Sequence, residues 1–418
     1  MPYQKYQNYQ DSKHIWIGEI PTSWTVVKLK TIVTEFIMGD TPNTGNHNYW
    51  SCEGIPWVSI ADISMTNVYL TQTAKKVSAK GLAAKNLKLL KEDTVLFSIY
   101  ASIGKTAILK IPAVTNQAIV GIVADKKSVT VKYLYYALLF SSFYLQKMSK
   151  NTIQPNLSLE TIKEMPISLP SLPEQKIIVA FLDDRLEKTT VLISKKEALL
   201  NLLDKRLASL RFQAVTQGLD LKVEMKTAKL YGPKKIPCHW DITKLKYLVQ
   251  SINNGTSPPE YLLKEGIPVY GANGLIGYCD TANTDNTVIV IGRVGSAGKI
   301  HLVRKPAWIS DNALILSGFD PSLDLTYFYY QLLTLNLDDL ATKNAQPLIT
   351  ASQIANLSIC LPPLREQKAI AQYLNEETKK NNSLYEQTQN SIVLLKEYQE
   401  SLINSAVTGK VNCQTEKC

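Results

Sequence analysis

The sequence predicts an α+β protein with a pseudo-two-fold internal repeat. Two tandem, mainly β domains that also contain helices are expected, separated by two long antiparallel coiled-coil helices. Three observations support this fold class: blocks of sequence occur twice, each copy has short strand-forming runs between turns, and each copy ends in a long stretch without proline or glycine. The expected boundaries are 1–172 for the first domain, 173–217 for the central helix, 218–363 for the second domain and 364–412 for the C-terminal helix.

The repeat covers almost the whole chain. Residues 18–33, GEIPTSWTVVKLKTIV, return as residues 234–249, KKIPCHWDITKLKYLV. Residues 162–182 return in the same way as residues 354–374, and LPSLPEQ in the first copy is matched by LPPLREQ in the second. The segments between these blocks differ greatly, so the repeat predicts one shared framework that presents two different surfaces.

Each domain is expected to be mainly β. The runs GIPWVSI, DTVLFSIY and AIVGIVA in the first copy, and GIPVYGA and NTVIVIG in the second, are rich in β-branched and aromatic residues between turns. The segments VKYLYYALLFSSFYLQKM and LTYFYYQLLTLNLDDL have helical spacing instead and predict core helices. Trp24 and Trp240, which close the two IPxxW blocks, are expected to anchor the two cores.

The proline- and glycine-free stretches predict two unusually long helices. The first, from Pro173 to Thr216, would be roughly 65 Å long at the rise of an α-helix. Apolar residues in both helices alternate at intervals of three and four, the spacing of a coiled-coil seam. The seam residues are Leu186, Ile193, Leu200, Leu203, Leu207 and Leu210 in the first helix, and Tyr385, Ile392, Leu395 and Leu402 in the second. The alternative is two amphipathic helices that each pack on their own domain.

The charge of the chain favours a polyanionic partner. The 418 residues carry a formal net charge of +10, although a lysine-rich solvated surface would give the same value. Residues 1–172 hold 18 Lys and Arg against 11 Asp and Glu, whereas residues 218–363 hold 13 against 12. If both copies bind the same polymer, the second must depend more on where its few cations lie.

Composition also excludes several classes of protein. No apolar run approaches the roughly 20 residues that span a bilayer, and the N-terminus lacks the apolar core of a signal peptide, so we expect a cytoplasmic protein without a membrane partner. The six cysteines form no CxxC pair and the four histidines show no ligand or triad spacing. We therefore expect no metal, no cofactor and no catalytic residue.

Two Gly-Lys turns are candidates for contact with phosphate. The turn of the first copy contains Ser102 and Lys105, and the turn of the second copy contains Ser296 and Lys299. Neither is a Walker loop, because Ile99 and Arg293 stand where its first glycine is required. A lysine on a glycine turn can contact a DNA phosphate, and Arg293 can contact guanine or phosphate in a bidentate manner. The alternative is a plain β-turn.

Two further pairs of polar loops carry candidate contacts to bases or phosphates. Amides and hydroxyls match the donors and acceptors of base edges, while ordinary surface loops have the same composition. In the first pair the candidates are Asn43, Thr44, Asn46 and His47, matched by Asn254 and Thr256. In the second pair, around a repeated Gln-Pro, they are Lys150, Gln154 and Asn156, matched by Lys343, Asn344 and Gln346. An ordered turn, in which Ser158 or Thr350 caps a short helix, would explain the second pair equally well.

These blocks together resemble the specificity subunit of type I restriction-modification enzymes. The resemblance spans residues 9–412, and its most specific features are LPSLPEQ and LPPLREQ at the starts of the long helices. It implies two target recognition domains that each read one half of a bipartite, asymmetric site in double-stranded DNA. It also implies that the helices dock two methyltransferase subunits, that restriction subunits join this core, and that catalysis belongs to these partners.

Two other functions compete with this interpretation. The chain could itself modify DNA, but it lacks the cofactor loop and catalytic motif that such an enzyme needs, and SPPEY departs from the adenine methyltransferase pattern. It could also be a coiled-coil scaffold protein without sequence-specific DNA binding. That function would leave the basic loops, and their divergence between the copies, unexplained.

Overall fold

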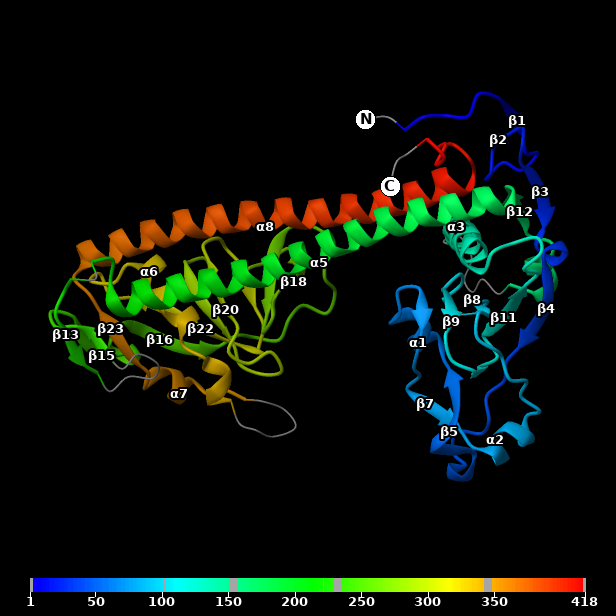
Figure 1. The fold of residues 1–418 in the computed structure, drawn as a ribbon. Coiled ribbons are helices and arrows are strands. Elements are labelled where there is room, and N and C mark those ends of the chain that lie inside the picture. Colours follow the sequence, from blue (N-terminus) through cyan, green and yellow to red (C-terminus); the bar gives the residue numbers. More distant parts are fainter. Residues whose placement is uncertain are drawn as a thin grey trace. The chain divides into compact units, whose positions relative to one another are not determined.

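The computed structural model describes residues 3–100, 102–149, 157–220, 222–228, 235–341 and 348–415. The chain forms two compact units (Figure 1). The first unit contains Met1–Lys195 together with Ser391–Cys418, and the second contains Lys196–Asn390. Both long helices therefore contribute one part to each unit, a division that the sequence does not reveal.

The first unit is built on a five-stranded sheet in the order β4-β11-β8-β9-β6. A three-stranded sheet, β10-β5-β7, and the pairs β1-β2 and β12-β3 complete it. Its strands are β1 (Tyr9–Asp11), β2 (Glu19–Pro21), β3 (Thr25–Lys28), β4 (Val33–Met38), β5 (Trp50–Val58), β6 (Tyr69–Leu70), β7 (Lys75–Val77), β8 (Val95–Ser98), β9 (Thr106–Leu109), β10 (Val114–Thr115), β11 (Ile119–Ala124) and β12 (Pro166–Leu169). Its shorter helices are η1 (Leu29–Thr31), η2 (His47–Tyr49), α1 (Ile60–Ser64), α2 (Ala79–Ala84), α3 (Val131–Ser149) and α4 (Leu159–Lys163).

The second unit repeats this plan around a four-stranded sheet in the order β16-β22-β19-β20. The sheet β18-β17-β21 and the pairs β13-β14 and β15-β23 accompany it. Its strands are β13 (Met225–Thr227), β14 (Lys235–Pro237), β15 (Asp241–Lys244), β16 (Val249–Asn254), β17 (Ile267–Gly271), β18 (Gly274–Cys279), β19 (Val288–Gly292), β20 (Ile300–Val303), β21 (Trp308–Ile309), β22 (Ala313–Phe319) and β23 (Ser358–Leu361). Its shorter helices are η3 (Leu245–Tyr247), α6 (Leu325–Thr334), η4 (Leu337–Leu340) and α7 (Ala351–Ala355).

The predicted internal repeat is confirmed strand by strand. The order β4-β11-β8-β9 in the first unit matches β16-β22-β19-β20 in the second, and the parallel pair β5-β10 matches β17-β21. Ser158 and Thr350 cap α4 and α7 through their hydroxyl oxygens, which accept from the backbone N–H of Thr161 and Gln353. The sequence offers these caps as the alternative explanation of the second pair of polar loops, and both are formed.

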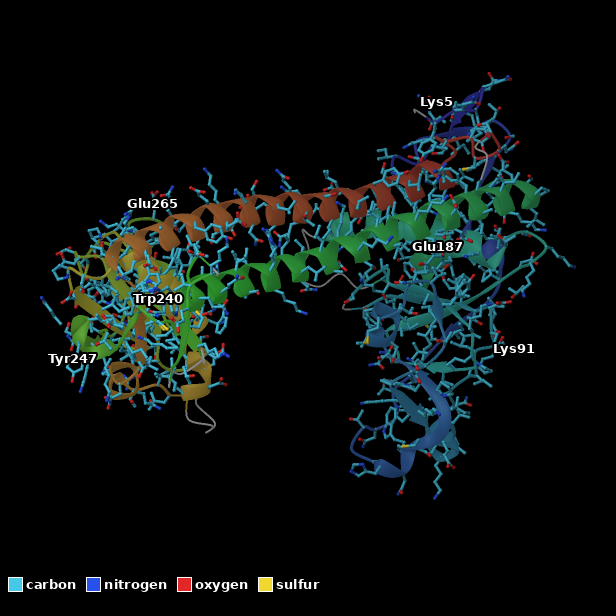
Figure 2. The ribbon with its side chains drawn as sticks, turned by 60° about the vertical axis from the view of Figure 1, so that its left-hand side comes forward. Lys5, Lys91, Glu187, Trp240, Tyr247 and Glu265 are labelled. Atoms are coloured by element: carbon cyan, nitrogen blue, oxygen red, sulfur yellow. The ribbon has the colours of Figure 1, made fainter. Side chains whose placement is uncertain are left out.

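The aromatic-rich helices are confirmed as parts of the two cores. Tyr133 of α3 and Tyr327 of α6 are fully buried, and so are Trp24 and Trp240 (Figure 2 labels Trp240). The Tyr133 hydroxyl donates to the Ser168 carbonyl at 2.8 Å. Burial raises the pKa of both tyrosines well above the ordinary value. Aromatic side chains at matching positions of the repeat thus pack α3 in the first unit, and α6 in the second, against the corresponding sheet.

The two long helices predicted from sequence are α5 (Leu172–Gln217) and α8 (Leu364–Val407). Within the first unit, the start of α5 lies near the end of α8, and further along Gln399 Nε2 donates to Thr189 Oγ1 at 2.8 Å. Within the second unit, Arg206 pairs with Glu377 at 2.9 Å, and Ala214, later in α5, shares a core with Ile370, earlier in α8. The helices are therefore antiparallel within each unit. The predicted seam side chains are buried or half-buried, whereas residues between them, such as Leu202 and Leu394, are exposed.

The last residues of the chain pack against its first residues inside the first unit. Tyr9 donates its hydroxyl to the Gly409 carbonyl at 2.9 Å, and Trp24 shares a core with Leu402, Ala406 and Val411. In the second unit Trp240 packs in the same way against the end of α5. Each IPxxW tryptophan thus rests on the end of a long helix, and in the first unit that helix comes from the other end of the sequence.

A buried glutamine explains the two LPxLxEQ motifs. Gln175 accepts a hydrogen bond from the Thr130 N–H at 2.8 Å and donates to the carbonyls of Ser128 and Pro170. Gln367 does the same with Asp324, Ser322 and Pro362. Because each side chain is buried and makes three bonds, it holds the loop before the core helix against the first turn of the long helix.

Replacing either glutamine with leucine should therefore destabilise its own unit. We expect Gln175→Leu to lower the free energy of unfolding of the first unit by about 2–4 kcal/mol, because three buried backbone groups lose their partners. Gln367→Leu should have a similar effect on the second unit. Denaturant unfolding followed unit by unit by hydrogen exchange would measure both. Gln389→Leu, at an exposed position of α8, is the control and should change stability by less than about 0.5 kcal/mol.

Candidate nucleic-acid interface

The first polar loop follows β4 and is held by its own side chains. Asn43 Oδ1 accepts from the Gly45 N–H at 2.9 Å, and Asn46 Oδ1 accepts from the Asn48 N–H at 3.1 Å. Both amides therefore shape the loop and leave the residues that follow them, Thr44 and His47, exposed. Two indole N–H groups also fix the backbone: Trp57 donates to the Asp40 carbonyl and Trp50 to the Asn43 carbonyl.

The corresponding loop of the second unit begins at exposed Asn254, the last residue of β16. Thr256 accepts from Asn283 Nδ2 at 2.8 Å through its hydroxyl, and from the Trp308 indole N–H through its carbonyl. The shared element is the glycine before each loop. A Cβ on Gly39 or Gly255 would lie within about 2.2 Å of a carbonyl oxygen of the neighbouring strand segment.

The two Gly-Lys turns have the same geometry. The Gly104 N–H donates to the Ser98 carbonyl at 2.9 Å, and the Gly298 N–H donates to the Gly292 carbonyl at 2.8 Å. Both glycines have positive φ, and neither could carry a Cβ without meeting a helical neighbour. The backbone conformation of the turns and the closeness of the helices thus explain why both positions are glycine. Lys105 and Lys299 remain exposed at the turns. Exposed Ser102 and half-buried Ser296 lie in the same turns.

The units differ beside these turns. Arg293 donates to the Asp311 carbonyl at 3.5 Å, and Ser257 lies 3.5 Å from the Asp311 carboxylate. In the first unit Ile99 makes the matching backbone bonds and is buried. The second unit therefore brings an arginine to its polar loop, whereas the first has an apolar residue at that place. His301 lies in β20, two residues after Lys299. Its burial and the positive charge of Lys299 both hold the pKa of the imidazole below the usual value.

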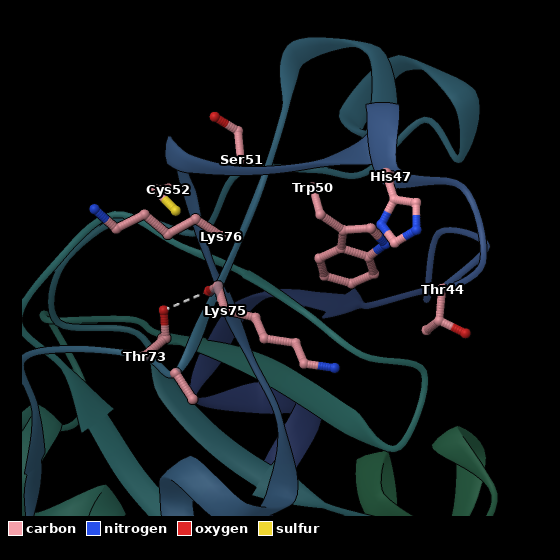
Figure 3. A pocket seen from close by; sticks show the side chains of 9 residues that line it. Thr44, His47, Trp50, Ser51, Cys52, Thr73, Lys75 and Lys76 are labelled. Carbon is pink, nitrogen blue, oxygen red and sulfur yellow. Dashed lines mark hydrogen bonds between the residues drawn. The ribbon is translucent and has the colours of Figure 1, made fainter.

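The first unit has a pocket beside its polar loop, with a volume of about 540 Å³ (Figure 3). Thr44 and His47, both predicted from sequence, contribute to its wall. The rest of the labelled wall comes from β5 and from the segment that ends in β7: Trp50, Ser51, Cys52, Thr73, Lys75 and Lys76. The Lys75 ammonium lies 5.5 Å from the centre of the Trp50 ring. These six residues were missed. The pairing of β5 with β7 brings Thr73, Lys75 and Lys76 to the loop around residue 45. Trp50, Ser51 and Cys52 follow that loop directly in the sequence.

The remaining candidates lie outside the described residues. They are Lys150, Gln154, Asn156, Lys343, Asn344 and Gln346. Across the described ranges, no group of His, Cys, Asp and Glu could hold a metal ion. No helix in the same ranges is long and apolar enough to cross a membrane.

Lys105 offers a direct test of phosphate contact. If its ammonium neutralises one phosphate, Lys105→Ala should weaken binding to every DNA sequence and reduce the slope of log affinity against log salt by about 0.9. Titrations of the assembled complex at several salt concentrations would measure the slope. Lys91→Ala, at an exposed position of the same unit (labelled in Figure 2), is the control. An unchanged slope for the Lys105 variant would remove this turn from the interface.

The sequence matches the type I restriction modification DNA specificity domain over residues 21–202 and again over residues 237–394. It is 26% identical to the type I restriction enzyme MjaIX specificity subunit of Methanocaldococcus jannaschii, with 98% of each chain covered. It is 25% identical to the EcoprrI specificity subunit of Escherichia coli, with 83% of this chain and 86% of that protein covered.

Two solved structures share the fold. A chain from a study of the assembly and conformational transition of the type I R-M system superposes with a TM-score of 0.72 at 18% identity, covering 93% of this chain and 98% of that one. The HsdS subunit from Thermoanaerobacter tengcongensis superposes with a TM-score of 0.53 at 17% identity, covering 94% and 98%. At these identities the likeness concerns the fold.

Proposed function

The chain belongs to the family of type I restriction-modification specificity subunits, and from this premise we propose how it divides recognition between its two units. Members of this family recognise DNA sequence and leave catalysis to other subunits. We infer that each unit reads one half of a bipartite, asymmetric site in double-stranded DNA. The observation that carries this proposal is one strand framework with two different loop surfaces.

The differences between the two surfaces support unlike half-sites. The first unit has a pocket with a tryptophan and two lysines, whereas the second brings Arg293 and Asp311 to its polar loop. A site read by two such surfaces would not be a palindrome. The more basic first copy would depend more on phosphate contacts, and the second more on individual polar groups.

The partners and location follow from the same proposal. Two methyltransferase subunits would dock on the long helices, restriction subunits would join this core, and the complex would act in the cytoplasm. Exposed apolar side chains on the helices, including Val191, Leu202 and Leu394, are available for such contacts.

Mapping methylated bases in the host genome, with and without this gene, tests the function. We expect one interrupted, asymmetric motif to be methylated only when the gene is present. A purified complex with the methyltransferase should also prefer that motif strongly over random duplex. Equal binding to both duplexes would instead favour a scaffold without sequence specificity.

A further inference from the structure

The pocket of the first unit combines a flat apolar surface with positive charge. The Trp50 side chain is half-buried, and its ring meets that of Trp57 edge to face at 5.2 Å. Its N–H is bound to the Asn43 carbonyl, so the orientation of the ring is fixed from two sides. Figure 3 shows His47 beside the indole and Lys75 extending along the other side of it. The ring is therefore held in place before any ligand arrives.

The charged groups of the pocket are cationic. Lys75 and Lys76 are exposed, and within the described ranges neither forms an ion pair with a carboxylate. Strand alternation directs them to opposite sides, as Figure 3 shows, with Lys76 on the side of Cys52. Among the residues that the structure describes, no carboxylate contributes to the wall. The Thr73 hydroxyl donates to the Lys75 carbonyl at 2.7 Å and so steadies the start of β7.

An anionic ligand that also carries apolar groups fits these features. A tryptophan ring can pack against the C5-methyl group of a thymine in the major groove, lysines neutralise phosphates, and a hydroxyl and an imidazole can bond to base edges. Nucleic acid supplies all of these groups at once.

The second unit does not repeat this arrangement. There β17 pairs with β18, in a hairpin that exposes Leu275 and Ile276, where the first unit pairs β5 with β7. A ligand contact at Trp50 would therefore belong to one half of the DNA site only.

We propose that this pocket is the sequence-reading contact of the first unit. Trp50 contacts a base of the first half-site, Thr44 and His47 bond to base edges beside it, and Lys75 and Lys76 hold the flanking phosphates. The inference rests on the proposed function and adds the residues through which one half-site is read.

The test uses the full chain in complex with its methyltransferase subunits and duplexes built on the mapped motif. Trp50→Ala should reduce affinity for the cognate duplex about tenfold or more, the range expected for the loss of one specific base contact. Discrimination against duplexes changed in the first half-site should fall, while discrimination against changes in the second half-site should persist. Trp50→Phe should retain most of both, and Lys91→Ala should change neither.

A second measurement separates contact from folding. Lys75→Ala removes an exposed side chain and should lower the salt slope by about 0.9 without lowering thermal stability. In the wild-type complex, 5-iodouracil placed in the first half-site should cross-link on irradiation to the peptide that contains His47 and Trp50.

The possible outcomes distinguish this inference from the proposed function. If the wild-type complex shows no preference for any duplex, the proposed function fails. If the preference exists but a folded Trp50→Ala variant keeps its first-half discrimination, this inference alone fails. Cross-links confined to other peptides of the first unit would overturn it as well.

Discussion

Exchanging residues 20–165 for the corresponding segment of a relative should change one half of the methylated motif and leave the other half unaltered. The exchanged segment contains the polar loop, the pocket and the Gly-Lys turn of the first unit. Its two ends fall in the shared blocks around Pro21 and Pro166, where β2 ends and β12 begins. The new surface should therefore be carried by the same framework.

Long-read methylation mapping of the host would measure this change. The matched control is the exchange of residues 236–357, the equivalent segment of the second unit, which should alter only the other half of the motif. Both exchanges leave the whole of α5 and α8 in place, so the number of unread bases between the halves should stay constant. A single exchange that rewrites both halves would contradict independent reading by the two units.

The framework of the protein could be predicted from its sequence because it rests on local patterns. The repeated blocks, the strand-forming runs and the proline- and glycine-free stretches each act over short distances along the chain. The helix caps at Ser158 and Thr350 were predictable for the same reason. The division into compact units was not, because it depends on Trp24 packing with Val411 at the other end of the sequence.

The candidate site was less accessible to sequence reasoning. Thr44 and His47 stand out within a polar loop, but Lys75 carries no local feature that connects it to them. The pairing of β5 with β7 creates that connection. The roles of Asn43 and Asn46 within the loop also depend on turn geometry.

Trp24→Ala should raise amide exchange at the opposite end of the sequence. The indole is fully buried in a core that it shares with Leu402, Ala406 and Val411 of the C-terminal region. Removing a buried tryptophan costs about 3–5 kcal/mol. Because opening free energy sets exchange in the native state, residues 391–413 should exchange about 100-fold faster or more. Peptide-resolved hydrogen exchange would measure this.

Trp240→Ala is the matched variant, and its effect should fall elsewhere. Trp240 packs with Ala214 and Val215, so faster exchange is expected in residues 196–217 and in the rest of the second unit. If each unit opens on its own, the two variants should each accelerate one part of α5 and a different part of α8. Uniform acceleration along both helices would show that the helix pair opens as one body. Each tryptophan would then stabilise the whole pair, and the stability of one unit would depend on the other.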